Sequence, residues 1–165
     1  MSGQFETKFI LFGLASCFLI ATLCIRVLIV GGLKTENTYF LLNFNLIRMI
    51  PYAFWLFKEI VKSSLHVSRA VINPDMVDAS VLWFKADYDN PLARAVLANS
   101  ITLTPGTITI DIFEDGIYSV NAVTKASRDE LLDGTMQHKV AWVFGEEIDY
   151  KVLGVEDKDE NERGE

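Results

Sequence analysis

One apolar run limits what this chain can fold into. Residues Phe9–Val30 (FILFGLASCFLIATLCIRVLIV) are 22 consecutive positions with a single charge, Arg26. As a helix the run would be about 33 Å long, against a bilayer hydrocarbon core of about 30 Å. The run therefore predicts a first membrane-spanning helix, within an N-terminal segment over residues 1–38.

A second run, Tyr39–Phe57 (YFLLNFNLIRMIPYAFWLF), has similar length but contains polar residues, and it predicts a second transmembrane helix. Within and beyond it, five residues recur at helical spacing and should share one face: Arg48, Tyr52, Trp55, Glu59 and Ser63. An arginine at this depth either lines an ion path or pairs with a partner near the end of a span, and the second role is more common. Arg26, Arg48 and Glu59 are thus the candidate membrane-embedded polar residues.

Two spans would place both termini on one side of the membrane. The basic residues Lys8, Lys58, Lys62 and Arg69 flank the spans on that side, whereas only Lys34 lies in the loop between them. The positive-inside rule therefore predicts a multi-pass membrane protein with both termini in the cytoplasm.

Leu14–Cys17 (LASC) matches a lipobox and raises the alternative of a lipoprotein. More than ten apolar residues follow Cys17, however, whereas a processed signal has a short apolar region and a polar mature start. Cys17 and Cys24 are about 10 Å apart along one helix, too far for a disulfide.

The segment after the second run, Val61–Ile72, continues a helical pattern to the end of a region over residues 39–72. Its periodicity fits either an amphipathic helix at the membrane interface or the buried first helix of a water-soluble domain. Asn73 precedes a proline and should end the helix.

The rest of the chain is acidic. Of the 22 Asp and Glu residues, only Glu6, Glu36 and Glu59 precede Asp75, and the net charge is −7. This charge argues against a nucleic-acid partner, whose phosphates attract Lys and Arg. The last stretch, Gly154–Glu165, has six acids and almost no apolar residue, so residues 151–165 predict a disordered, solvated tail.

Between these regions, residues 73–150 predict a small cytoplasmic α/β domain. Asn90 and Pro91 have the residue types of a helix cap and first turn, and Ser127–Glu130 matches a capping box. The expected elements are a strand at Ser80–Ala86, a helix at Leu92–Asn99, a strand at Ile117–Val123, a helix over about Arg128–His138 and a strand at Lys139–Phe144.

The stretch Ser100–Ile110 (SITLTPGTITI) alternates polar and apolar residues on both sides of a Pro-Gly pair. Pro105 and Gly106 fit the two central positions of a type II turn. The alternation predicts two short strands or one sharply bent strand. Ile108, Ile110 and Ile112 should form the apolar face, with Thr107, Thr109 and Asp111 opposite.

No catalytic, cofactor-binding or metal-binding residue is predicted. Ser100 and Thr104 lack the surroundings of a nucleophile elbow, and Gly106 lacks the company of a phosphate-binding loop. His66 and His138 have no zinc-type spacing. Three acids near a turn are expected to be solvated surface: Asp111, Glu114 and Asp115.

A longer stretch, Leu97–Thr107 (LANSITLTPGT), resembles the signature of the E subunit of the multisubunit sodium/proton antiporter, the Mrp, Pha or Mnh type. The resemblance covers about residues 43–123. Upstream it includes Arg48, Tyr52, Phe57, Glu59 and Ser63. Downstream, Asn121 stands where the family tends to have the histidine of an aromatic-x-Val-His pattern.

This resemblance implies an accessory, non-catalytic subunit that supports assembly and activity of an antiporter complex, with ion paths mainly in the large subunits. It implies no cofactor, and as partners other membrane subunits and the lipid bilayer. Relatives also anchor membrane-bound hydrogenases and related redox-driven pumps, which is the alternative setting. The implied docking or folding element comprises Asn99, Ser100, Thr102, Thr104, Pro105, Gly106 and Thr107.

Overall fold

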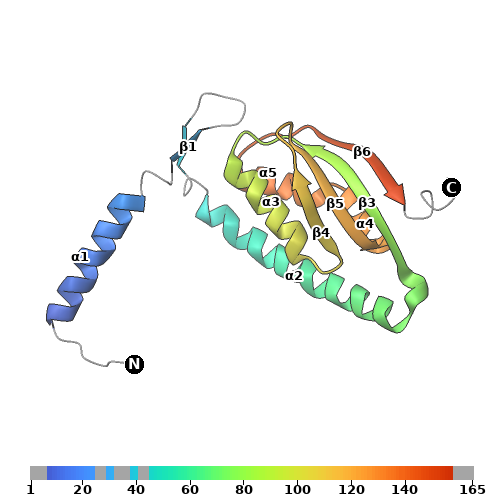
Figure 1. Cartoon of the computed structure of the whole chain (residues 1–165), viewed down its shortest axis with the longest axis horizontal. Coiled ribbons are helices and arrows are strands. Elements are labelled where there is room, and N and C mark those ends of the chain that lie inside the picture. The colour runs from blue at the N-terminus through green and yellow to red at the C-terminus, as the bar shows by residue number, and fades with distance from the viewer. Residues whose placement is uncertain (1–6, 25–28, 32–37, 41–44, 158–165) are drawn as a thin grey trace. The chain divides into compact units, whose positions relative to one another are not determined.

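The structure is a computed structural model that describes residues 7–24, 29–31, 38–40 and 45–157. The chain divides into two compact units, Met1–Asn43 and Phe44–Glu165. The first contains helix α1 (Thr7–Cys24) and a two-stranded antiparallel sheet of β1 (Ile29–Gly31) and β2 (Thr38–Phe40) (Figure 1). Large apolar side chains of α1 are exposed: Leu11, Phe12, Leu14, Phe18, Leu19, Ile20 and Leu23.

The two predicted spans differ from the helices that are present. Of the helices in the described part of the chain, none is long and apolar enough to cross a membrane. Arg26 of the first run lies outside the described residues. The predicted helix start at Tyr39 is wrong: residues Thr38–Phe40 form a strand, and the side chain of Asn45 accepts a hydrogen bond from the N–H of Ile47 to cap a helix that begins at Leu46.

The second unit is the α/β domain expected from the sequence. Its sheet is antiparallel in the order β4-β5-β3-β6. Its elements are α2 (Leu46–Ile72), the short 3₁₀ helix η1 (Pro74–Met76), β3 (Val77–Ala86), α3 (Pro91–Leu103), β4 (Thr107–Ile112), β5 (Ile117–Thr124), α4 (Lys125–Leu132), α5 (Thr135–Phe144) and β6 (Tyr150–Asp157).

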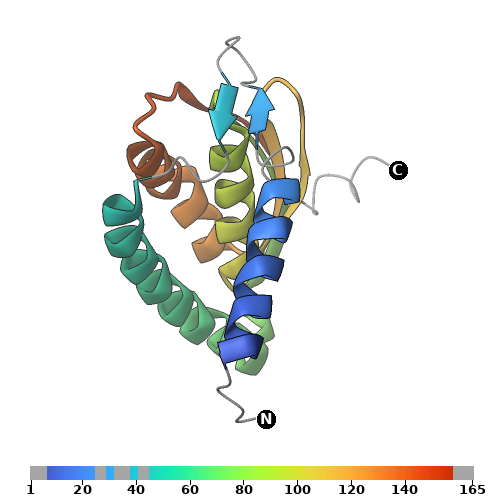
Figure 2. The same ribbon diagram turned by 90° about the vertical axis from the view of Figure 1, so that its left-hand side faces the viewer.

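The domain has three layers (Figures 1 and 2). Helices α3, α4 and α5 cover one face of the sheet, and α2 lies across them, with hydrogen bonds to Ser100 of α3, Glu130 of α4 and Trp142 of α5. The core lies between the sheet and the three helices. Its largest fully buried side chains include Leu82, Phe84, Tyr88, Leu97, Ile101, Tyr118, Val120 and Val140.

The segment Val61–Ile72 fits the interpretation as part of the first helix of the domain, whereas its position at the membrane interface stays a prediction. The segment is the continuation of α2 rather than a separate helix. Ser63 and Ala70 are buried against the domain, whereas Val61 and Leu65 on the opposite side are exposed. Helix α2 is therefore the first helix of the domain and also presents an apolar outer face.

Two predicted strands and one predicted helix need correction. Ser100–Leu103 continues helix α3, and Lys139–Phe144 belongs to helix α5. The helix expected over Arg128–His138 is interrupted at Gly134, which has a φ of 76° and separates α4 from α5. The predicted tail is ordered at its beginning, because β6 pairs with β3 up to Asp157. Residues 158–165 lie outside the described part of the chain.

Candidate functional site

The signature stretch forms the junction between helix α3 and strand β4. Pro105 and Gly106 occupy the centre of a turn that is closed by a hydrogen bond of 3.2 Å from the N–H of Thr107 to the carbonyl of Thr104. Gly106 has a φ of 90°, as a type II turn requires at this position. The predicted turn is confirmed, but it follows a helix and not a strand.

The threonine hydroxyls of the junction bind the last carbonyls of α3. The Thr107 hydroxyl lies 2.6 Å from the carbonyl of Ile101 and 2.9 Å from that of Thr104, and the Thr104 hydroxyl donates to the carbonyl of Ser100 at 2.9 Å. Thr104 and Thr107 are both buried. A helix ends with carbonyls that have no partner within the helix, and here side chains supply the donors.

Hydrogen bonds from threonine hydroxyls to a carbonyl of α3 also determine which side of strand β4 faces this helix. The hydroxyls of Thr102 and Thr109 both donate to the carbonyl of Ala98, at 3.0 Å and 3.1 Å, so the threonine side of the strand faces α3. Ile108 and Ile110 are 56% exposed on the opposite side. The predicted alternation is therefore present at these positions, and the isoleucine side of the strand is the exposed one.

Gly106 is also the point where three elements meet. A Cβ atom at Gly106 would lie 2.8 Å from the Ser127 hydroxyl of α4 and 2.9 Å from a methyl of Val67 of α2. The Ser127 hydroxyl also forms a hydrogen bond of 2.9 Å with the Thr124 hydroxyl, so it cannot move away from Gly106 without losing this bond. The turn therefore packs closely against both helices and has no room for a side chain.

The five residues predicted to share a helical face do so, and this face packs on the domain. Tyr52 is buried and donates a hydrogen bond of 2.7 Å to the Ser100 hydroxyl. Arg48 donates to the carbonyl of Trp142 at 2.9 Å, with its guanidinium 5.4 Å from the centre of that indole ring. The structure thus gives Arg48 a partner within the chain, at the C-terminal end of α5.

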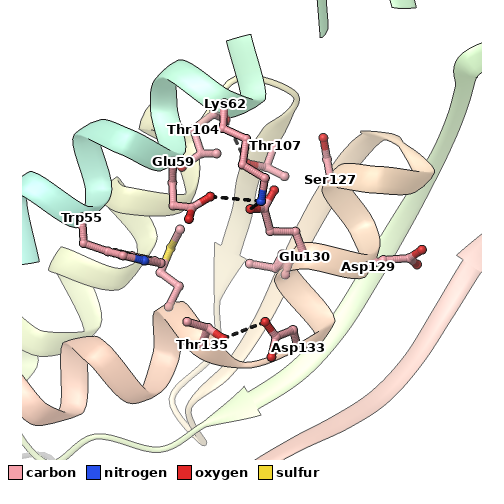
Figure 3. A pocket seen from close by; sticks show the side chains of 12 residues that line it. Trp55, Glu59, Lys62, Thr104, Thr107, Ser127, Asp129, Glu130, Asp133 and Thr135 are labelled. Carbon is pink, nitrogen blue, oxygen red and sulfur yellow. Dashed lines mark hydrogen bonds and ion pairs between the residues drawn. The ribbon is translucent and has the colours of Figure 1, made fainter. Parts of the chain in front are cut away.

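Beside the junction lies a pocket of about 280 Å³ between α2, α4 and α5 (Figure 3). Thr104 and Thr107 line one part of it. At its rim, the ammonium of Lys62 is 2.7 Å from a carboxylate oxygen of Glu130 and 3.4 Å from one of Glu59. Glu59, predicted as membrane-embedded, instead belongs to an ionic cluster that ties α2 to α4.

The two carboxyl groups of this cluster differ in their affinity for a proton. A hydrogen bond with Glu130 raises the pKa of Glu59, and burial and the Glu130 charge raise it further. For Glu130, burial alone would raise the pKa, but hydrogen bonds with Glu59 and Lys62 outweigh it and leave the pKa lowered. Glu130 is therefore the more readily ionised partner of Lys62, and Glu59 retains its proton to higher pH.

One buried arginine, Arg94, was not predicted from the sequence. Arg94 of α3 is 8% exposed in its side chain and lies 3.0 Å from a carboxylate oxygen of Asp87. It also donates to the carbonyls of Tyr88 at 3.1 Å and Glu114 at 2.8 Å, so it joins two loops at one end of the sheet. A lone cation within the apolar run LARAVL was the available signal.

The structure also shows where the possible metal ligands and the other residues of the motif lie. Within the described residues, no group of three or more His, Cys, Asp and Glu side chains is placed to hold a metal ion. Of the motif residues, Ser100, Thr104 and Thr107 are buried, whereas Asn99 and Thr102 are exposed. The junction is thus a structural element in which the buried hydroxyls bind the chain itself.

Comparison with known proteins places this architecture in a family. The model of the family described as Na+/H+ ion antiporter subunit matches residues 1–143, which include the junction and all of the second unit except the end of α5 and β6. The chain belongs to this family. The resemblance to the E subunit of the Mrp-type antiporter is confirmed.

The chain is similar to the E1 subunit of a Na(+)/H(+) antiporter from Staphylococcus saprophyticus. The two are 30% identical over 93 residues. The match covers 53% of this chain and 58% of the relative, so the chain spans little more than half of the relative's length.

Asn121, which the sequence singled out as a departure from the resemblance, lies in strand β5. The Oδ1 atom of Asn121 in β5 is buried and has no hydrogen-bond partner among the described residues. An amide does not titrate as a histidine would, so this strand position has no proton-binding side chain.

Proposed function

We propose that this protein is an accessory, non-catalytic subunit of a multisubunit sodium/proton antiporter in the cytoplasmic membrane, and that its α/β unit supports assembly of the complex. Membership of the antiporter subunit family is the observation that carries this proposal. The partners are the other membrane subunits and the lipid bilayer.

The use of polar groups at the junction supports a structural role. Three hydroxyls donate hydrogen bonds to carbonyls of α3. The distances are 2.7 Å for Ser100, 2.9 Å for Thr104 and 2.6 Å for the shorter bond of Thr107. A hydroxyl that holds the end of its own helix is poorly placed to coordinate a passing cation. The motif therefore shapes the domain surface, and the cation path belongs to other subunits.

The exposed apolar surfaces support a position at the membrane. Helix α1 exposes leucine and phenylalanine side chains to more than 60%, among them Leu11, Phe12 and Phe18. Exposed apolar patches of this kind mark membrane or protein interfaces. The orientation with both termini in the cytoplasm stays a prediction from the distribution of basic residues.

The test is purification of the tagged full chain from its host in a mild detergent. The proposal expects large multi-span antiporter subunits to co-purify; recovery of a lone, stable species would contradict it. Nickel-iron or iron–sulfur proteins among the partners would indicate the hydrogenase-type complex instead.

Variants of the junction separate assembly from ion exchange. Gly106→Val should reduce recovery of the partners, because the turn loses its backbone geometry and its close packing. Gly154→Val is the matched control, because a side chain there meets nothing within 4 Å. Thr102→Val should retain both the partners and sodium-dependent proton exchange in membrane vesicles. Loss of exchange with an intact complex would refute the structural role of the motif.

A further inference from the structure

The outward face of helix α2 is an apolar stripe that no other described element of the second unit covers. Tyr52, Ser63 and Ala70 point into the domain and are buried. On the opposite side, seven large apolar side chains are 46% to 81% exposed and recur mostly every three or four positions: Leu46, Ile47, Ile50, Phe54, Phe57, Val61 and Leu65. The stripe follows the helix for about 28 Å.

Charges along the stripe have one sign. Lys58, Lys62 and Arg69 are exposed and lie along one edge of the stripe. The only acid of α2, Glu59, faces the inner cluster at a side-chain exposure of 15%. In a chain with a net charge of −7, this face is therefore a local positive surface.

The charge and the apolar surface meet in a shallow groove. The groove has a volume of about 480 Å³ and is lined by Phe57, Val61 and Leu65 together with basic side chains of the same helix. Lys62 is engaged by Glu130 and Glu59. Lys58 and Arg69 form no ion pair with any residue of the described ranges, so their charges are available to an outside partner.

A bilayer that contains anionic lipids matches both properties. Its acyl boundary takes the apolar side chains of an amphipathic helix, and its headgroups attract a basic edge. An apolar partner helix would account for the stripe but not for the basic edge. We propose that the outward face of α2 lies on an anionic bilayer surface, with Phe57, Val61 and Leu65 at the acyl boundary and Lys58 and Arg69 against lipid phosphates.

This inference rests on the membrane location in the proposed function but needs no antiporter partner. The test uses the full chain with Cys17→Ser and Cys24→Ser, and a nitroxide label at Val61→Cys on the stripe. The control label is at Glu114→Cys, in an exposed turn of the domain. The protein is reconstituted in vesicles of phosphatidylcholine alone or of phosphatidylcholine with phosphatidylglycerol.

The readout is the collision rate of the label with oxygen, which enters lipid, relative to that with a water-soluble nickel complex. The Val61→Cys label should shift toward oxygen in the anionic vesicles only, and the Glu114→Cys label should not shift. Lys58→Gln and Arg69→Gln should each weaken the lipid contact about fivefold, the effect of one basic residue at an anionic surface. Circular dichroism of each variant checks that the fold is retained.

Three results would overturn the inference. A water-exposed Val61→Cys label in both vesicles would show that the face does not lie on lipid. An equal shift in both would show that the charges play no part. A label shielded from both probes in the purified complex would assign the face to a protein partner. The vesicle measurement uses the isolated chain, so its result does not depend on the co-purification of partners. A failure of the lipid contact and a failure of the proposed function can therefore be told apart.

Discussion

Replacing Thr107 by valine tests whether the junction depends on its hydroxyls. Valine keeps the shape of the side chain and removes only the donor to the carbonyls of Ile101 and Thr104. Each carbonyl keeps one backbone donor, from the N–H of Thr104 at 3.1 Å and of Thr107 at 3.2 Å, so neither becomes an orphan. We therefore expect the loss of one shared, buried hydrogen bond, about 0.5–1.5 kcal/mol in the free energy of unfolding.

The assay is thermal unfolding of the full chain in detergent, followed by tryptophan emission. All three tryptophans lie in the second unit, so the signal reports on the α/β domain: Trp55, Trp83 and Trp142. A loss of about 0.5–1.5 kcal/mol should lower the midpoint by about 2–8 °C in a domain of this size.

The matched control is Thr102→Val in the same motif. Thr102 also bonds a carbonyl of α3, but it is exposed, and the carbonyl of Ala98 keeps a second side-chain donor in Thr109. Its effect should stay below about 0.5 kcal/mol. Equal shifts for Thr102→Val and Thr107→Val, or no shift for Thr107→Val, would refute the reasoning from burial.

Further substitutions test three other sites of contact by the same unfolding assay. Gly106→Ala should cost about 1–2 kcal/mol because of its positive φ, with more from its short contacts, whereas Gly154→Ala in open space should change little. The raised pKa of Glu59 means that the folded protein binds this proton more tightly than the unfolded chain does. The resulting contribution to the free energy of unfolding is complete below the ordinary carboxyl pKa, and it is lost as the pH rises through the raised pKa. Glu59→Gln should thus raise the unfolding midpoint at about pH 8 and change it little at about pH 4. Glu130→Gln should instead lower the midpoint at about pH 8. The same response from both variants would contradict the assignment of the proton to Glu59. Arg48→Gln removes a charged donor at the end of α5 and should cost about 1 kcal/mol; an unchanged midpoint would show that this contact contributes nothing.

The sequence predicted local features well. Asn90 caps α3 through its side chain and Pro91 begins the helix, as its residue types indicated. The type II turn and the shared face of α2 are also where the sequence placed them. These features depend on residues within a few positions of one another, so their physics is visible in a short window.

Elements whose state depends on distant contacts were harder to predict. Lys139–Phe144 is rich in β-branched and aromatic residues, yet it lies in a helix. Gly134 is the N-cap of that helix, and the side chains of Val140, Ala141 and Val143 pack into the core. Strand β6 was missed because the contact that defines it, its pairing with β3, is a long-range backbone contact that a short window of sequence does not show.

The signature stretch marks the division between sequence and tertiary structure. By itself the sequence determined the Pro105–Gly106 turn, since the proline ring fixes φ and glycine, which has no Cβ, readily adopts the positive φ that the next position requires. Only the tertiary structure decided that Ser100–Leu103 is helical and that the threonines of β4 point inward. The reason is that the carbonyls at the end of α3 need donors, and Thr104 and Thr107 satisfy them once helix and strand are adjacent.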